Sequence, residues 1–362
     1  MATFKFSKFA AVFVAVASII GVNVFGNKVE NASGNEILNR GPTKVLFAGN
    51  PIIYQFANAE ESVIASFSEE FESLGELITI ETATPGGSAS NGASAYGYLG
   101  GDCAFFGILG DDHHAENFHN NLASYGVEIL APRRPGAITC QLYSFVTPDK
   151  DRTMYVLLGA SHSLRPGDIS YDIMDRFDYF AFTAFILSTE KQIEFTYEMV
   201  EAARSLGKGI ITLLSNTWCI RTNGDRLRQL ADISDYVSDN VEEFSMLYSI
   251  EDPENLIKTL ATRTAGEKPT NKAIIMTMGG EGALVFYHGK KYYVPPSGVN
   301  VVDTTGAGDV FAGGLLYGIL NGWSVRKAGE FAVAVVGDLI SHFGTYMKPE
   351  TRAKINQIKA SA

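Results

Sequence analysis

The segment whose residues most clearly indicate chemistry is DTTGAGD, residues 303–309. We expect an apolar strand before it and a helix after it. Gly306 and Gly308 let backbone N–H groups converge at the start of that helix, where the amides and the helix dipole attract anions. Asp309 lies inside this anion cradle and would repel its ligand. The carboxylate is explained if Asp309 is a general base, which takes the proton of a hydroxyl that attacks a phosphoryl group.

A simpler interpretation of GAGD is a helix that starts at glycine, with the Asp as its N-terminal charge partner. The longer DTTGAGD, followed by a helix that contains Gly-Gly, favours ligand binding instead. A dinucleotide-binding fingerprint needs a small residue where Phe311 stands, which argues against a nicotinamide-dependent enzyme. The P-loop pattern G-x-x-x-x-G-K-[ST] does not occur in the sequence.

Two further segments carry polar groups that could serve a ligand. Gly86 and Gly87 permit a close backbone approach to a sugar, and Asn91 offers a donor and an acceptor to vicinal hydroxyls. Asn91 is alternatively a plain N-cap of the helix expected at 91–99. Glu243 follows a strand end and could be a solvated charge, but Asn240 beside it favours a site for a hard cation such as Mg²⁺.

These segments resemble, in order, the signatures of the PfkB (ribokinase-like) carbohydrate and nucleoside kinases. Residues 303–309 resemble the C-terminal signature, NVEE at 240–243 the N-x-x-E element, and TMGGEGA at 277–283 the T-x-G-x-x-G-A turn. The N-terminal signature is matched within 86–112 by Gly86, Gly87, Asn91, Gly100, Gly107, Gly110 and Asp112. The resemblance covers roughly residues 44–350. VTPDKDRTMYVLLGAS (146–161) is most similar to the adenosine-kinase-like bacterial sugar kinases.

The resemblance implies transfer of the γ-phosphoryl group of ATP to a hydroxymethyl group of a fructose- or ribose-like sugar or of a nucleoside such as adenosine. It implies Asp309 as the base and the amides of Gly306, Ala307 and Gly308 as the anion hole. The other implied roles are acceptor binding by Asn50, Tyr54, Gly86, Gly87 and Asn91, nucleotide binding by Asn240, Thr277, Gly279 and Gly282, and organisation of Mg²⁺ by Glu243. Cofactors are then ATP and Mg²⁺, with room for a monovalent cation such as K⁺.

One residue departs from the family pattern on the acceptor side. The first strand is usually followed by G-N/E-x-x-x-D, whose Asp binds two acceptor hydroxyls, but here Tyr54 takes that place. A phenol cannot accept two charge-assisted hydrogen bonds. Tyr54 could instead stack on a base or sugar face, or narrow the site toward a smaller sugar. This departure keeps open an alternative function, a catalytically weak sugar- or nucleoside-binding protein of the same fold.

The remaining chain alternates short apolar runs with amphipathic stretches, which predicts an α/β fold with a mainly parallel sheet and helices on both faces. Strands are expected at 44–49, 103–107, 179–182, 209–214, 236–240, 273–278, 282–287 and 291–295, and helices at 91–99, 113–125, 189–206, 222–231, 241–249, 307–320, 324–342 and 350–359. A hairpin around Pro148 breaks the alternation and predicts a small β lid formed partly by about 131–158. The resemblance implies the same three-layer ribokinase-like fold, with eight or nine strands in the sheet.

Composition supports a globular enzyme. Of the 362 residues, 46% are hydrophobic and 19% charged, which excludes general disorder. A net charge of −11 argues against a nucleic-acid partner, because binding to phosphates needs a basic surface. Three widely spaced cysteines exclude a disulfide framework and are expected to be buried thiols in a reducing compartment.

Residues 1–43 form a separate segment, followed by the kinase-like domain at 44–362. Lys5 and Lys8 precede an apolar run over 9–26, which resembles a signal peptide or a short membrane anchor, and residues 27–43 have the composition of a polar linker. We expect a cytoplasmic enzyme, with export or membrane contact left open if residues 9–26 are retained. A homodimer is left open too, since some relatives pair through their lids.

Overall fold

In the computed structural model, residues 2–5, 43–58, 80, 82–146 and 152–360 are described. A large sheet of these residues has nine strands in the order β14-β13-β12-β11-β10-β9-β2-β5-β6. The strands from β12 to β6 run parallel, and β13 and β14 pair antiparallel at one edge. Their bounds are Lys44–Ala48 (β2), Asp102–Phe106 (β5), Glu128–Ile129 (β6), Tyr179–Thr183 (β9), Gly209–Leu213 (β10), Tyr236–Asn240 (β11), Ala273–Thr277 (β12), Ala283–Tyr287 (β13) and Lys290–Val294 (β14).

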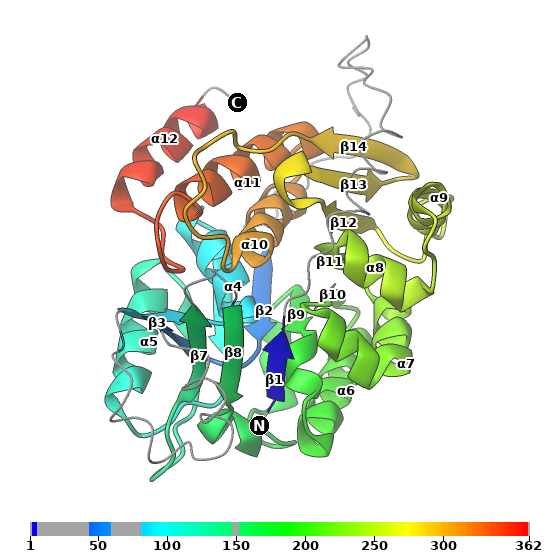
Figure 1. The fold of residues 1–362 in the computed structure, drawn as a ribbon. Coiled ribbons are helices and arrows are strands. Elements are labelled where there is room, and N and C mark those ends of the chain that lie inside the picture. The colour runs from blue at the N-terminus through cyan, green and yellow to red at the C-terminus, as the bar shows by residue number, and fades with distance from the viewer. Residues whose placement is uncertain (1, 6–42, 59–79, 81, 147–151, 361–362) are drawn as a thin grey trace.

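Helices cover both faces of the large sheet, as the alternating sequence predicts (Figure 1). Along β2, Val45 and Phe47 pack into a core shared with α4, α5, α10 and α11, whereas Leu46 and Ala48 pack into a second core shared with α6–α9. This period of two places the side chains of residues 45–48 alternately in two apolar layers, whereas Lys44 is exposed. The helices are Ser88–Tyr98 (α4), His113–Ser124 (α5), Glu190–Ser205 (α6), Thr217–Ile233 (α7), Val241–Tyr248 (α8), Pro253–Arg263 (α9), Ala307–Leu320 (α10), Val325–Leu339 (α11) and Pro349–Ala360 (α12).

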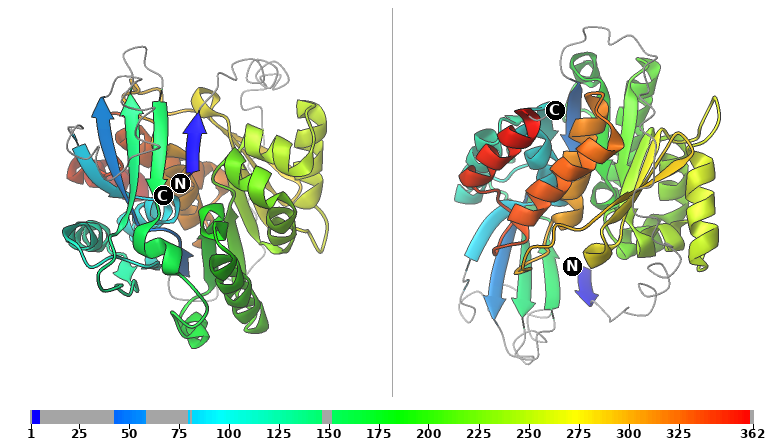
Figure 2. Two further views of the ribbon diagram at one scale, coloured as in Figure 1. Left: turned by 60° about the horizontal axis from the view of Figure 1, so that its bottom comes forward. Right: turned by 90° about the horizontal axis from the view of Figure 1, so that it is seen from above.

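A second, smaller sheet has the order β1-β8-β7-β3-β4 (Figure 2). Its strands are Ala2–Lys5 (β1), Ile52–Asn58 (β3), Thr82–Gly86 (β4), Cys140–Val146 (β7) and Arg152–Leu157 (β8). Strand β3 leaves the carboxyl end of β2 after only three residues, and β4 ends one residue before α4 begins. The small sheet therefore starts at the edge of the large sheet where parallel strands place their carboxyl ends.

The expected three-layer α/β/α fold with a small second sheet is confirmed. The expected lid hairpin corresponds to β7 and β8, whose connecting turn lies outside the described residues. Strands β3 and β4 were not predicted. Conversely, the apolar strand expected just before Asp303 is not found: residues 295–302 are irregular, and Val299, Val301 and Val302 are exposed. That segment runs beside the end of α11, where the Val302 N–H donates to the Ile340 carbonyl. It pairs with no strand of the described chain.

Most of the N-terminal segment lies outside the described residues, including the apolar run 9–26 and nearly all of the linker expected at 27–43. Within it, Ala2–Lys5 pair antiparallel with β8. None of the helices in the described ranges combines the length and the apolar character that crossing a membrane requires.

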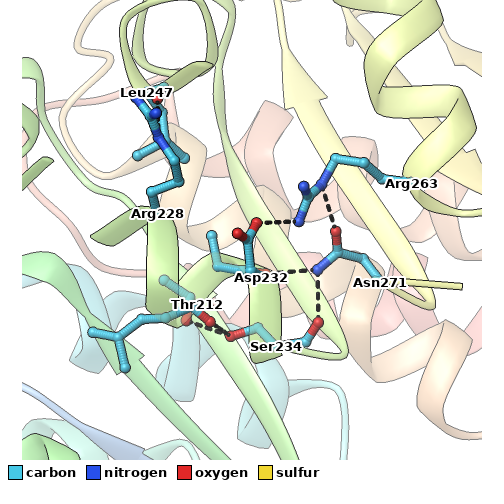
Figure 3. A network of polar contacts seen from close by, with 9 residues as sticks. Thr212, Arg228, Asp232, Ser234, Leu247, Arg263 and Asn271 are labelled. Carbon is cyan, nitrogen blue, oxygen red and sulfur yellow. Dashed lines mark hydrogen bonds and ion pairs between the residues drawn. The ribbon is translucent and has the colours of Figure 1, made fainter. Parts of the chain in front are cut away.

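A buried polar network lies at the amino ends of β11 and β12, away from the carboxyl ends of the strands (Figure 3). The fully buried Asn271, just before β12, donates to the carbonyls of Ala231 and Ser234 at 2.8 and 2.7 Å. Its own carbonyl accepts from Arg263 at 2.9 Å, and the same guanidinium binds Asp232 at 2.7 Å. The network ties the ends of α7 and α9 to the starts of β11 and β12, far along these strands from their carboxyl ends.

We expect Asn271→Ala to lower the free energy of unfolding by about 2 kcal/mol, because two buried carbonyls lose their donor and an arginine loses an acceptor. The midpoint of urea denaturation measures this. Asn255→Ala, at an exposed asparagine of α9, serves as the control and should change the stability by less than about 0.5 kcal/mol. Equal stability of both variants would contradict the structural role of the network.

Candidate active site

The candidate site is built around Asp309, in the first turn of α10. The helix begins after Gly306, whose φ of +74° is a left-handed conformation that glycine adopts without strain. A Cβ at Gly306 would lie 2.6 Å from the Asn91 Nδ2 atom, so the turn and α4 approach too closely for any side chain there. At Gly308, in contrast, a Cβ would meet nothing within 4 Å. Packing does not explain Gly308, and an open helix N-terminus is suited to an anion.

Both oxygens of the Asp309 carboxylate accept hydrogen bonds from α4. The Ser88 hydroxyl donates to Oδ1, and Asn91 Nδ2 donates to Oδ2 at 3.1 Å. Burial raises the pKa of Asp309, while these two hydrogen bonds act to lower it. Each carboxylate oxygen has a second lone pair, so the group still has capacity for the proton of a substrate hydroxyl.

Asn91 lies inside α4 and is not its N-cap residue. Helix α4 begins at Ser88, with Gly87 as its N-cap residue, so Asn91 lies within the first turn and is 2% exposed. The N-cap alternative for Asn91 is wrong. Its amide holds Asp309, which makes it a positioning group for the carboxylate as well as a candidate for acceptor binding.

One of the three N–H groups of the predicted anion hole already has a hydrogen-bond partner within the turn. The Ala307 N–H donates to the Thr304 carbonyl at 3.1 Å. This leaves the amides of Gly306 and Gly308 as the stronger candidates for holding a phosphoryl group. Below the turn, Asp303 is 3% exposed and accepts from the Thr305 N–H, the Thr305 hydroxyl and the Gly344 N–H, which fixes the entry to the glycine turn.

On the acceptor side, Tyr54 stands over Gly86. A Cβ at Gly86 would lie 2.2 Å from Tyr54 Cε2, so this glycine makes room for the tyrosine ring. The phenol interacts with the Gly87 backbone and with the Asn91 side chain, and it feels the charge of Asp309. Burial, with a smaller contribution from that charge, raises the pKa of Tyr54 well above its ordinary value. Tyr54 is 8% exposed, so most of its ring is unavailable for stacking on a ligand.

Asn50 and Gly87 lie beside each other next to this tyrosine. Gly87 has a φ of +108°, and a Cβ there would be 2.5 Å from the Asn50 carbonyl oxygen. The Asn50 side chain is directed to other partners: it donates to the Phe185 carbonyl at 3.3 Å and accepts from Gln192 at 3.4 Å. The structure thus brings all five predicted acceptor residues to the start of α4, with the Asn50 amide serving the protein itself.

The predicted nucleotide-side residues gather at the carboxyl ends of β11 and β12. Asn240 and Thr277 are register partners, and the Thr277 hydroxyl donates to the Asp239 carbonyl at 3.5 Å. Asn240 caps α8 by accepting from the N–H groups of Glu242 and Glu243 at 2.8 and 3.1 Å. Gly279 and Gly282 form the turn into β13. A Cβ at Gly282 would lie 2.2 Å from the Val294 oxygen, so β14 explains this glycine by packing.

Glu243 is only 5% exposed, so the alternative of a solvated charge on the face of α8 is wrong. Its neighbour Asp239, the residue before Asn240, was not predicted as a site residue. Burial raises the pKa of Glu243 to about 7, and burial together with the charge of Glu243 raises the pKa of Asp239 well above its ordinary value. Buried carboxylates that disfavour their own ionisation are suited to a cation.

Sequence analysis also missed Ser88 and Ser215. Ser215 follows β10 with a φ of +72°, and its hydroxyl lies 3.5 Å from that of Ser88. A serine in the left-handed region carries strain that the surrounding structure must maintain. Composition and motif spacing give no signal for such a backbone. For Ser88, its position within GGSASN next to Asn91 was an available signal.

The expected burial of the cysteines is confirmed. Cys103, Cys140 and Cys219 are free and buried. Burial raises the pKa of each thiol above its ordinary value, which keeps the thiols protonated and unreactive.

The chain is similar in sequence and fold to several known proteins. The family model described as pfkB family carbohydrate kinase matches residues 55–352. The aminoimidazole riboside kinase of Salmonella typhimurium is 28% identical over 64% of this chain and 73% of its own. The deoxyribokinase of Salmonella typhi is 29% identical over 72% of this chain and 82% of its own. The crystal structure of adenosine kinase from Sinorhizobium meliloti superposes with a TM-score of 0.78 at 26% identity, covering 88% of this chain and 99% of that one.

We expect Ser88→Ala to raise the pKa of Asp309, because a hydrogen bond that favours the ionised form is lost. The carboxyl carbon signal in ¹³C NMR, assigned by its disappearance in Asp309→Asn, would titrate at higher pH. Ser94→Ala, at a buried serine of the same helix that is not a partner of Asp309, should leave the midpoint unchanged. An unchanged or lower midpoint in Ser88→Ala would refute the assignment of Ser88 as a donor that stabilises the anion.

Proposed function

Because this chain belongs to the pfkB family of carbohydrate kinases, we propose that it transfers the γ-phosphoryl group of ATP to a hydroxymethyl group of a sugar or nucleoside. The observation that carries the proposal is the Asp309 carboxylate, held by two donors from α4 at the open N-terminus of α10. A base and an anion site within one helical turn provide what in-line attack by an alcohol requires.

In this proposal each side of the site has a separate task. Asp309 accepts the proton of the acceptor hydroxyl as that oxygen attacks phosphorus. The amides of Gly306 and Gly308, at the positive end of α10, stabilise the charge on the migrating phosphoryl group. Asn240, Thr277 and the turn at Gly279 and Gly282 lie at the nucleotide side. Lys and Arg are not among the predicted residues, so neutralisation of the phosphates falls to a cation.

The residues present fit a divalent cation. Glu243 Oε2 is buried and has no hydrogen-bond partner in the described part of the chain, which suits an atom that ligates a cation. Mg²⁺ favours one or two carboxylates together with water and nucleotide phosphates. Glu243 would hold it directly or through water, and Mg²⁺ would neutralise negative charge on the phosphates. A monovalent cation such as K⁺ stays a prediction from the resemblance.

We propose that Tyr54 limits the size of the acceptor. Its ring fills the space over Gly86, where close approach to a sugar was expected, and its hydroxyl reaches Asn91, the group expected to bind vicinal hydroxyls. Both effects reduce the room beside Asp309. Of the two sequence-based alternatives, narrowing of the site therefore fits the structure better than stacking on a base.

The same observation favours one second candidate, a sugar- or nucleoside-binding protein of weak catalytic activity. The two functions differ in a single measurement. A coupled assay of ADP release over a panel of sugars and nucleosides, run beside calorimetry, reports turnover and binding separately. Binding without ADP release would favour the second candidate. The reducing compartment, a homodimer and the lack of a nucleic-acid partner stay predictions.

We expect Asp309→Asn to lower turnover by at least ~100-fold, since a positioned general base is lost while its shape is kept. Calorimetry should show that the variant still binds MgATP. Asp225→Asn, at an exposed aspartate of α7, is the matched control and should retain full turnover. Turnover of Asp309→Asn within tenfold of the unaltered protein would eliminate Asp309 as the base.

We expect Tyr54→Ala to raise kcat/KM for adenosine at least ~10-fold relative to fructose, because removing the ring opens the acceptor side to the larger substrate. Tyr54→Phe keeps the ring and should preserve the original ratio. A fall in the adenosine-to-fructose ratio of Tyr54→Ala would instead identify Tyr54 as a stacking platform, and an unchanged ratio would show that the ring has no effect on acceptor size.

A further inference from the structure

Asp239 and Glu243 form a pair of carboxylates at the junction of β11 and α8. Asp239 is the penultimate residue of β11, and Glu243 lies in the first turn of α8, on either side of the capping residue Asn240. Asp239 Oδ1 accepts from the Asn240 N–H at 2.9 Å. The two side chains are close enough to affect each other's ionisation. The family signature places Glu243 here but has no counterpart for Asp239.

One oxygen of each carboxylate lacks a partner. Asp239 Oδ2 and Glu243 Oε2 are both buried, and no hydrogen-bond donor in the described ranges reaches them. Glu243 as a whole is 95% buried, since its exposed fraction is 5%. Unpartnered buried carboxylate oxygens are costly, so a protein keeps them when something outside the chain completes them.

The surrounding charge increases this cost. Two acidic groups, Glu243 and Asp309, act on Asp239, and the acidic Glu242 acts on Glu243. Among the described residues, the ion pairs include none of Asp239, Glu243 and Asp309. A cation from solution is therefore the group that would balance the cluster.

A short polar chain connects the pair to Asp309. The Ser215 backbone interacts with Asp239, and the Ser215 hydroxyl lies 3.5 Å from that of Ser88, which donates to Asp309. The strained Ser215 turn thus lies between the carboxylate pair and the proposed base. This places the pair near Asp309, the proposed base.

We propose that Asp239 is a second carboxylate ligand for the divalent cation, and that with Glu243 it allows this chain to hold the cation before nucleotide binds. Two carboxylates and water satisfy the preference of Mg²⁺ for oxygen ligands. The inference rests on the proposed kinase function only for the role of the cation, not for its binding. The cation would bring positive charge to a cluster that otherwise repels the phosphates of ATP.

The test is Mn²⁺ binding to the full chain without nucleotide, measured by the electron paramagnetic resonance signal of free Mn²⁺ and displaced by excess Mg²⁺. We expect one site, weakened at least ~10-fold in Asp239→Asn and in Glu243→Gln, because each variant removes one of two charged ligands. Glu242→Gln, at an exposed residue of the same helical turn, is the matched control and should change the affinity by less than about threefold.

Thermal unfolding provides a second readout. Mn²⁺ should raise the Tm of the unaltered protein and leave the Tm of Asp239→Asn unchanged, since a ligand stabilises only the state that binds it. Should Asp239→Asn fail to fold, Asp239→Ser provides the same comparison. Affinity for Mn²⁺ that is equal in the unaltered protein and in the folded Asp239 variant would overturn the proposal, as would the lack of any Mn²⁺ binding without nucleotide.

These outcomes are separable from a failure of the proposed function. Mn²⁺ binding that depends on Asp239, in a protein that releases no ADP with any acceptor, would retain the cation site and remove the kinase. Phosphoryl transfer that is normal in Asp239→Asn, with unaltered Mn²⁺ binding, would retain the kinase and remove Asp239 from the site.

Discussion

Negative charge gathered at the carboxyl edge of the sheet, with no balancing ion pair among the described residues, is the constraint on which the site depends. Asp309, Asp239 and Glu243 come from α10, β11 and α8, and burial disfavours the ionised form of each. In the proposed function, such a site would oppose the binding of free ATP, which is itself an anion. A cation that arrives with the nucleotide or before it would convert this repulsion into attraction, because a metal ion is the largest local charge in a site of this kind.

The fold meets this constraint by fixing the helices that carry the charges. Helix α10 lies against α4 so closely that a Cβ at Gly313 would be 2.3 Å from the Gly92 carbonyl oxygen. On its other side, a Cβ at Gly318 would be 2.5 Å from the Ala328 Cβ of α11. Helix α10 therefore has little freedom to shift, and the donors of α4 keep a constant relation to Asp309. Rigid elements of this kind maintain the geometry that phosphoryl transfer relies on.

The sequence predicted the glycine turn before α10 and the residues that gather at the start of α4, but not Ser88, Ser215 or Asp239, for physical reasons. Apolar strands alternating with amphipathic helices predict the layers, and glycine spacing predicts the turn before α10. Strands β3 and β4 belong to a small sheet whose pairing is long-range, so local pattern did not identify them. At residues 299–302 a strand was predicted and none is found, because apolar composition alone does not distinguish a strand from an exposed segment. Asp239 and the left-handed Ser215 become visible only when β10 and β11 are placed side by side.

Tyr54, which departs from the family pattern, changes the role of Gly86 in this chain. In the family pattern, an Asp at this place binds the acceptor, and glycine allows the acceptor to approach the backbone. Here the Tyr54 ring takes the space over Gly86, so that this glycine accommodates a side chain of the protein itself. The phosphate side can retain its geometry while the acceptor side varies, because the two are joined through α4, whose Asn91 contacts both Asp309 and Tyr54. In the proposed function, a substitution on β3 would therefore alter which alcohol fits without moving Asp309, the proposed base.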